Sequence, residues 1–470
     1  MMGRVENTKI AIIGGGIAGL ALAASLAKKK HLDVHLYEGT NCTDPGASLT
    51  LQVNALKTLS LLGSDVMRAY FEKTLMAAEE DQEAKTEVTL AHCPRGSQFI
   101  VQFNKVRPSM AVGRTALLDG FRTLIPPDRI SSGKRLVHIV ENPTAQGHRV
   151  QLTFEDGTSA SVDCLLGADG AHSITRAYIL GPSHPATAPK NHDKWRVYRT
   201  IVSTKEIHEH ISTKWMTNMP ILFQPKGHMG RMRINRNTGP HAGVAARGSN
   251  VKSANRGPAL DPTQYTDHSE AGQHIVRLVA RDKSAFLPAA DHDHAPFYAR
   301  GNIAIVGDAA HASLPFAGAG AAQALEDVLT LSDLFDSIGL LSDIPLALLA
   351  FCDTRRPRSQ AIVDISRQLG REHSAATDDM RKKPPPSINM FFAQAVKFAN
   401  DFDARRQSAE AVLRFSELQR RRVATGMVEV QAARGRLKGI SSLPVTCTEK
   451  PLCNASLEAY IGLPSAYTST

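Results

Sequence analysis

Cysteine and tryptophan are scarce in this chain of 470 residues. The six cysteines are scattered and form no C-x-x-C pair, which excludes a disulfide-rich scaffold and argues against a zinc ribbon. Hydrophobic residues at 42% and charged residues at 21% supply enough apolar material for a core without such links. We therefore expect reduced thiols in an intracellular, cytoplasmic protein with more than one domain.

Long uninterrupted apolar runs and hydrolase motifs are also absent. The apolar run at residues 10–27 contains Gly14, Gly16 and Gly19 and ends in lysines, so it predicts neither a signal peptide nor stable membrane insertion. No G-x-S-x-G sequence occurs, and an acyl hydrolase therefore has no support.

The charge balance is basic, with a net charge of +10. The basic residues are spread along the chain, with their densest runs at 381–383 and 420–422, and no known nucleic-acid-binding module occurs. A solvated basic face explains this charge most simply, and a general attraction for anionic small molecules is the alternative. Nucleic acid is not expected as a partner.

The strongest motif lies at the N-terminus, where the short apolar run 9–13 leads into a G-x-G-x-x-G sequence. Gly14 allows the tight turn, Gly16 lets the backbone approach a pyrophosphate, and Gly19 lets the following helix pack on the strand. Phosphates would lie against the N-terminus of that helix. Glu38 ends a second apolar run, where an acid binds ribose hydroxyls. The motif predicts a dinucleotide, without distinguishing FAD from NAD.

Two later motifs repeat the order of a buried strand followed by an acid. Asp169 is followed by Gly170, and Asp308 is preceded by Gly307. A carboxylate at a strand's C-terminal end can hold ribityl or ribose hydroxyls. Glycines in the loop 315–320 permit close backbone approach to a flat ring, and the next helix would direct its positive end at a reduced flavin.

The three motifs, in this order, resemble those of the FAD-dependent aromatic hydroxylases, the single-component flavoprotein monooxygenases, and most closely their salicylate-hydroxylase-like branch. The resemblance covers roughly residues 8–375. It implies that Glu38 holds the adenosine ribose, that Arg114 contacts FAD and that Asp308 binds the ribityl–pyrophosphate region. The residues expected to bind the cofactor are Gly14, Gly16, Gly19, Glu38, Arg114, Asp169, Asp308, Gly318 and Gly320.

The expected fold is α/β, with a Rossmann-type FAD-binding domain, a smaller β-rich substrate domain and a helical C-terminal tail. The amphipathic segment 404–437 is expected to pack on the body or on a neighbouring subunit, as in a homodimer. The predicted ranges are 1–75, 106–185 and 290–365 for the discontinuous FAD-binding domain, 76–105 and 186–289 for the substrate-covering domain, and 366–470 for the helical region.

Tyr198 and Arg199, on a predicted strand of the covering domain, are the candidates for contacting the substrate and supporting catalysis. The alternative is that both face solvent or pair internally. The sequence Asp291-His-Asp-His294 suggests a metal cluster, but a solvated turn is the preferred interpretation, and no metal is expected. His311 is expected to pack or to form hydrogen bonds rather than to act as a base.

The resemblance implies an FAD-dependent, NAD(P)H-consuming monooxygenase that hydroxylates an aromatic, phenolic small molecule with molecular oxygen through a flavin C4a-hydroperoxide. Epoxidation or oxidative dearomatisation of a secondary metabolite is the alternative on the same fold. An NAD-dependent dehydrogenase and a catalytically silent flavin-binding protein are the alternatives from other classes. The substrate, the choice between NADH and NADPH, and the oligomeric state stay open.

Overall fold

The computed structural model of the chain describes most of the two predicted domains and half of the helical tail. Residues 375–384 and 436–470 of the predicted C-terminal region lie outside the described residues. The described residues are 7–39, 49–74, 85–90, 98–104, 110–142, 149–202, 206, 221–224, 227–232, 241–247, 259–287, 289–374 and 385–435.

A six-stranded sheet, mostly parallel, forms the centre of the body. Its order is β17-β18-β11-β1-β2-β7, and only β17 pairs in the antiparallel sense. The inner strands β1 and β11 are apolar and buried, as expected when both faces of a sheet are covered. The bounds are Thr8–Ile13 for β1, Leu32–Glu38 for β2, Ile130–Ser132 for β7, Cys164–Gly167 for β11, Ala299–Arg300 for β17 and Ile303–Ile305 for β18.

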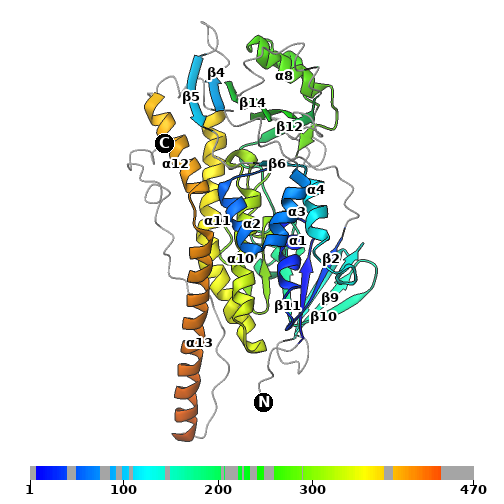
Figure 1. Ribbon diagram of the computed structural model, residues 1–470, viewed down its shortest axis with the longest axis vertical. Coiled ribbons are helices and arrows are strands. Elements are labelled where there is room, and N and C mark those ends of the chain that lie inside the picture. Colours follow the sequence, from blue (N-terminus) through cyan, green and yellow to red (C-terminus); the bar gives the residue numbers. More distant parts are fainter. Residues whose placement is uncertain are drawn as a thin grey trace.

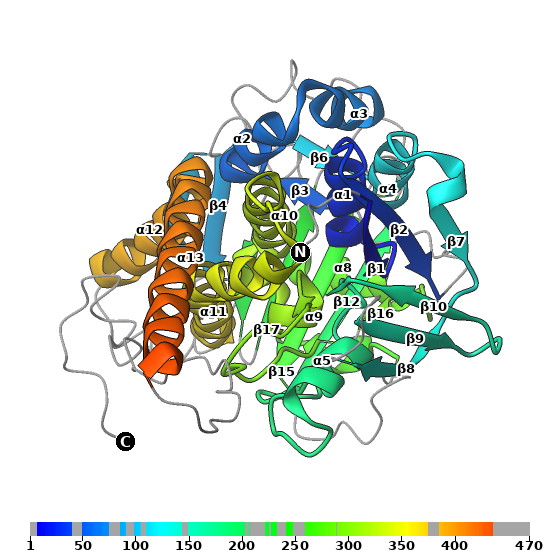
Figure 2. The ribbon, with the colours of Figure 1, turned by 90° about the horizontal axis from the view of Figure 1, so that it is seen from below.

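Helices cover one face of this sheet, and a second, smaller sheet covers the other (Figure 2). The helix α1 (Ile17–Leu26) packs against α4 (Arg114–Arg122) and α10 (Gly320–Asp336). On the other side lies a three-stranded antiparallel sheet, whose Phe154 ring packs 4.7 Å from that of Tyr37 in β2. Its strands are β8 (Leu136–Glu141), β9 (Val150–Phe154) and β10 (Ser159–Val162), and the short helix α5 (Ile174–Leu180) packs beside β8.

A seven-stranded sheet, here called the cover sheet, lies at one end of the body (Figure 1). The helix α8 (Glu270–Ala280) packs on its outer face, away from the body. The strand order is β16-β12-β15-β14-β13-β4-β5. The bounds are Lys85–Leu90 for β4, Gln98–Asn104 for β5, Trp195–Ile201 for β12, Ile221–Gln224 for β13, Gly227–Met232 for β14, His241–Arg247 for β15 and Phe286–Leu287 for β16.

The remaining elements join the two sheets. The strands β3 (Leu49–Leu51) and β6 (Met110–Val112) form a two-stranded sheet. Along the chain, β3 is followed by α2 (Val53–Leu62) and α3 (Ser64–Thr74), and β6 is followed by α4. The expected α/β class with a parallel Rossmann-type sheet is confirmed, while the predicted domain boundaries stay predictions. The three-stranded sheet and α8 were not predicted. Among the described residues, no helix is both long and apolar enough to cross a membrane.

The described part of the C-terminal region is helical. The helix α11 (Ile344–Ser374) is followed by α12 (Pro385–Asn400) and α13 (Ala404–Gly435). The first half of α13 packs along α10 and α11, and the rest extends beyond the body (Figure 1). Ser408 of α13 donates a hydrogen bond to Asp333 at 2.6 Å. The first half of the segment therefore packs on the body, which is one of the two expected arrangements, and a homodimer stays a prediction.

Charged side chains are enclosed where α10, α11 and α13 meet. Arg355 is fully buried, and its Nε donates to Asp327 Oδ1 at 2.8 Å while its Nη1 donates to Glu326 Oε2 at 2.7 Å. The same Nη1 donates to Gln407 of α13 at 2.6 Å, and Nη2 donates to the Gln323 carbonyl at 3.1 Å. We call Gln323, Glu326, Asp327, Arg355 and Arg358 the buried ionic network.

The network reaches the turn that precedes α9 (Asp308–His311). Asp327 Oδ2 accepts hydrogen bonds from the Gly307 backbone N–H at 2.9 Å and from His311 Nε2 at 2.7 Å. Burial opposes ionisation of Asp327, but His311, Arg355 and these hydrogen bonds hold its pKa below the usual range. Although burial alone would lower it, the two carboxylates raise the pKa of Arg355. Asp327 and Arg355 are therefore both charged at neutral pH.

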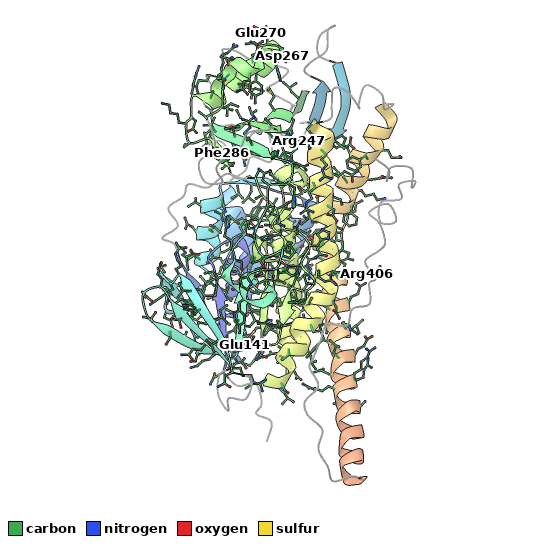
Figure 3. All side chains as sticks on the ribbon, turned by 180° about the vertical axis from the view of Figure 1, so that it is seen from behind. Glu141, Arg247, Asp267, Glu270, Phe286 and Arg406 are labelled. Carbon is green, nitrogen blue, oxygen red and sulfur yellow. The ribbon has the colours of Figure 1, made fainter. Side chains whose placement is uncertain are left out.

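Replacement of Arg355 should be far more damaging than replacement of an exposed arginine. Arg355→Ala leaves two buried carboxylates without their main partner, which should reduce the free energy of unfolding by ~3–5 kcal/mol. The control, Arg406→Ala, breaks an exposed pair with Glu410 on α13 and should cost less than ~0.5 kcal/mol (Figure 3). Chemical denaturation of both variants is the measurement. Equal losses would contradict the assignment of the network as a structural centre.

Candidate active site

The glycines of the turn after β1 differ in what surrounds them. Gly14 has φ = +104°, and a Cβ there would lie 2.3 Å from the Ala168 carbonyl oxygen. A Cβ at Gly19 would lie 1.9 Å from the Gly14 carbonyl oxygen. A Cβ at Gly16, in contrast, would meet no protein atom within 4 Å. Gly14 and Gly19 are therefore required by the chain itself, whereas the space at Gly16 is open to a ligand.

The first helix presents its N-terminus at this opening. Gly16 is the N-cap of α1, and no side chain caps the helix, so its first backbone N–H groups can receive an anion. Glu38, the last residue of β2, accepts a hydrogen bond from the Gly15 N–H. An acid is therefore fixed beside the phosphate-binding turn, as ribose recognition in a dinucleotide requires.

Arg114 is the first residue of α4, and no side chain caps that helix either. The guanidinium is partly buried and forms no hydrogen bond or ion pair with the other described residues. A cation at the positive end of a helix is unfavourable unless an anion lies nearby. The position is therefore suited to a phosphate, in agreement with the role implied for Arg114 by the resemblance.

The two acids of the later motifs differ in how far the protein itself satisfies them. Asp169 accepts hydrogen bonds from Ser173 Oγ at 2.5 Å and from the Thr175 backbone N–H at 3.0 Å. Burial raises the pKa of Asp169 against these hydrogen bonds. Asp308 is exposed at the start of α9, and its carboxylate has no partner among the described residues. Asp169 therefore holds its own turn together, and Asp308 is the acid available to a ligand.

Arg176, fully buried in α5, ties the two acidic motifs together. Its Nη1 donates to the carbonyls of Ala309 and Ala310 in α9, at 3.0 and 2.7 Å, and its Nε donates to the Ala186 carbonyl at 2.6 Å. Burial lowers the pKa of Arg176 to about 10, so it stays charged at neutral pH. Asp169 and Asp308 are therefore held at a fixed separation by a residue that contacts neither.

The glycine-rich loop after α9 borders a small cavity. Gly318 has φ = +61°, and two helices begin at the cavity without a side-chain cap, α2 after Gln52 and α10 at Gly320. Two helix N-termini favour negative charge between them, such as that of a reduced flavin ring. The residues present thus fit FAD along its length. The cavity is lined by Leu51, Gln52, Asn54, Ala55, Ala317, Gly318, Ala319, Ala322, Ala399 and Asn400.

The structure places Tyr198 and Arg199 on opposite faces of β12, as alternation requires. Tyr198 is buried in the apolar cluster beneath α8, on the outer face of the cover sheet. Trp195 belongs to the inner face, where its ring lies 4.5 Å from that of Phe316 in the glycine-rich loop. Arg199 shares the side of Trp195 and therefore faces the body. Of the two candidates, only Arg199 lies on the face that carries Trp195 and approaches the glycine-rich loop.

The interpretation of residues 291–294 as a solvated turn is wrong for its first two members. Asp291 is buried and forms a bidentate ion pair with Arg367, at 2.6 and 3.2 Å. His292 is buried as well, with Nε2 at 2.8 Å from the Ala171 carbonyl. Among the described residues, no group of His, Cys, Asp and Glu is arranged to hold a metal ion. The hydrogen-bonding role expected of His311 is confirmed by its contact with Asp327.

The open phosphate-binding turn, the free acid at α9 and the glycine-rich loop define an FAD-binding protein with a Rossmann-type fold. A family model described as an FAD binding domain matches residues 7–366. The chain therefore belongs to the FAD-dependent aromatic hydroxylase family and is an FAD-dependent monooxygenase. The alternative of a dehydrogenase that uses NAD without flavin is thereby wrong.

Named relatives cover most of the chain. It is 34% identical over 378 residues to a 6-methylsalicylate 1-monooxygenase of Aspergillus terreus, across 77% of this chain and 82% of the relative. It is 28% identical over 387 residues to a salicylate hydroxylase of Pseudomonas putida, across 77% and 85% of the two chains.

Solved structures support the fold. A salicylate hydroxylase substrate complex matches with a TM-score of 0.73 at 24% identity, across 87% of this chain and 98% of that chain. HpxO of Klebsiella pneumoniae, complexed with FAD and uric acid, matches with a TM-score of 0.64 at 20% identity, across 87% and 96% of the two chains.

The contrast between Gly14 and Gly16 can be tested by alanine substitution. Gly16→Ala should fold with wild-type thermal stability, because its Cβ meets no protein atom, but should bind FAD at least about tenfold more weakly. Gly14→Ala should lower the stability of the FAD-free protein, because its Cβ collides with the Ala168 carbonyl. Thermal melts and FAD titration are the measurements. Undiminished FAD affinity in Gly16→Ala would remove the pyrophosphate from this turn.

The contrast between the two acids predicts opposite effects. Asp308→Ala should leave the stability of the FAD-free protein within ~0.5 kcal/mol of wild type and weaken FAD binding by about tenfold. Asp169→Ala should lower the free energy of unfolding by ~1–3 kcal/mol, because Ser173 and Thr175 lose their acceptor. Denaturation of FAD-free protein and FAD titration separate the two effects. Wild-type FAD binding by Asp308→Ala would contradict the assignment.

Proposed function

We propose that this monooxygenase hydroxylates a small phenolic acid, with NAD(P)H as reductant and molecular oxygen as oxidant. The proposal rests on Arg199 and on the shape of the cover sheet around it. Arg199 in β12 pairs with Gly243 in β15, and Gly243 pairs with Gly230 in β14. A Cβ at Gly243 would meet only the Tyr198 carbonyl oxygen, at 3.5 Å. The inner face therefore has a shallow strip without side chains next to a cation.

The strip is suited to a flat anionic ring. Burial lowers the pKa of Arg199, and a carboxylate placed beside the guanidinium would replace the solvation that it has lost. The names of the relatives agree with this chemistry, since both 6-methylsalicylate and salicylate combine a carboxylate with a ring hydroxyl. FAD, when bound, would carry electrons from NAD(P)H to oxygen and deliver one oxygen atom to the ring.

The protein's own residues would bind, orient and enclose the ring. Arg199 would hold the carboxylate from the cover sheet, while the loop of Pro315–Ala317 would approach the ring from the body. Enclosure between sheet and loop would exclude water, which strengthens each polar contact and protects the oxidant. Epoxidation or dearomatisation of a secondary metabolite remains the alternative on the same fold.

The function is tested by reduction of the flavin and by product structure. FAD-loaded protein is mixed anaerobically with NADPH, and then with NADH, in the presence of 6-methylsalicylate, salicylate or phenols without a carboxylate. Faster bleaching with the acids, followed by an oxygenated product in air, supports the proposal. Carbon dioxide release distinguishes replacement of the carboxylate from attack at a ring C–H. Flavin that no phenolic acid renders reducible would refute it.

Arg199→Ala should raise KM for the acid substrate by about tenfold to 100-fold, since hydrogen bonds to a charged group contribute ~1.5–3 kcal/mol. Its FAD content should be unchanged. Arg281→Ala is the matched control, because Arg281 lies on the surface of the same domain in an exposed pair with Glu206. Steady-state kinetics with both variants is the measurement. An unchanged KM in Arg199→Ala would remove this residue from the substrate site.

A further inference from the structure

Three rings meet between the cover sheet and the glycine-rich loop. Trp195 of β12 lies 4.5 Å from Phe316 and 6.3 Å from His228 of β14, measured between ring centroids, and Phe316 lies 5.3 Å from His228. His228 pairs with Ala245 in β15, which pairs with Val197 in β12. His228 therefore belongs to the inner-face row next to that of Arg199, roughly 7 Å along the strands.

Trp195 carries an unexplained polar atom. Its side chain is 1% exposed, and the indole N–H has no hydrogen-bond partner among the described residues. A buried donor without a partner loses its hydrogen bond to water without a replacement, so such groups are rare in folded proteins. The backbone of Trp195 is fixed by the Asn191 side chain through two hydrogen bonds of 2.7 Å. Because the indole can only donate, the missing partner is an acceptor.

His228 supplies the complementary chemistry. Its Nδ1 is buried, and burial lowers the pKa of the imidazole to about 4. The ring is therefore neutral at physiological pH and offers one donor and one acceptor nitrogen. A phenolic hydroxyl ionises near pH 10, roughly six units higher, so the proton would stay on the hydroxyl oxygen and be shared through a hydrogen bond.

We propose that Trp195 and His228 together recognise the ring hydroxyl of the substrate, with the indole N–H donating to its oxygen and the imidazole accepting its proton in a hydrogen bond. The inference rests on the proposed function, in which Arg199 holds the carboxylate. Neighbouring residue rows on the inner face of the cover sheet would then bind the carboxylate and the hydroxyl of the same ring. Trp195 and His228 thereby select hydroxylated aromatic acids over acids that lack the hydroxyl. They also orient the ring towards the glycine-rich loop that carries Phe316.

Selectivity can be measured without turnover. Oxidised, FAD-loaded enzyme is titrated with salicylate, benzoate and 2-methoxybenzoate, and binding is followed by the perturbation of the flavin absorbance. Wild-type enzyme should bind salicylate at least about tenfold more tightly than either analogue. Trp195→Phe and His228→Phe keep an aromatic ring at each position but remove its hydrogen-bonding group. Each should reduce this preference to about threefold or less while leaving benzoate affinity within about twofold.

Benzoate binding and FAD content report on folding. A variant that is misfolded should therefore lose affinity for salicylate and benzoate to the same extent. In that event the conservative variants His228→Asn and Trp195→Tyr, which keep a hydrogen-bonding group at each position, should recover both benzoate binding and the preference for salicylate. Tyr265→Phe, which removes a hydroxyl beneath α8 on the outer face of the cover sheet, is the control and should keep the full preference.

Wild-type preference for salicylate in folded Trp195→Phe and His228→Phe would overturn the proposed recognition of the hydroxyl by these two residues, as would loss of the preference in folded His228→Asn and Trp195→Tyr. Equal wild-type affinity for salicylate and benzoate would also overturn it, but would leave the proposed hydroxylation standing if NADPH-driven turnover of phenolic acids is seen. Failure of the wild-type enzyme to bind any of the acids would refute both.

Discussion

One buried guanidinium and two buried carboxylates set the geometry on which the flavin site depends. Removing charges from water costs several kcal/mol per ion. The buried charges of Arg355, Glu326 and Asp327 are therefore tolerated only while both ion pairs of Arg355 are formed. Asp327 also accepts the Gly307 N–H, so one carboxylate sets both the packing of α10 on α11 and the start of α9. Gln407 extends the constraint to α13. The C-terminal helices therefore belong to the same body as the flavin-binding turn.

Around this centre, the polar residues fall into two groups. Some form hydrogen bonds within the protein and stabilise the fold, and others have no protein partner and can bind a ligand. Asp169 and Arg176 form hydrogen bonds with other residues of the protein. Arg114 and Asp308 have no such partners among the described residues, although both stand at the start of a helix. Both side chains reach solvent at the edge of the site, so both are open to a cofactor.

In the proposed function the inner face of the cover sheet gives the enzyme its substrate selectivity, and close packing holds that face against the body. A Cβ at Gly370 in α11 would lie 2.5 Å from the Phe316 ring and 3.1 Å from the Trp195 ring, so only glycine lets the helix approach both. Arg247 lies at the end of the covering domain near the body, and Glu270 lies at its far end (Figure 3). Alternation along β12 then decides which side chains can meet a substrate.

The sequence by itself determined the fold class, the glycine turn after β1 and the acids that end successive strands, because each depends on neighbours within a short stretch of chain. It could not show that Asp169 is satisfied internally while Asp308 is free, nor that Asp291 is buried by Arg367 from α11. Those contacts, like that of Trp195 with the glycine-rich loop, join residues far apart in the chain. Burial and pairing are properties of the packed structure, and only the tertiary structure decided them.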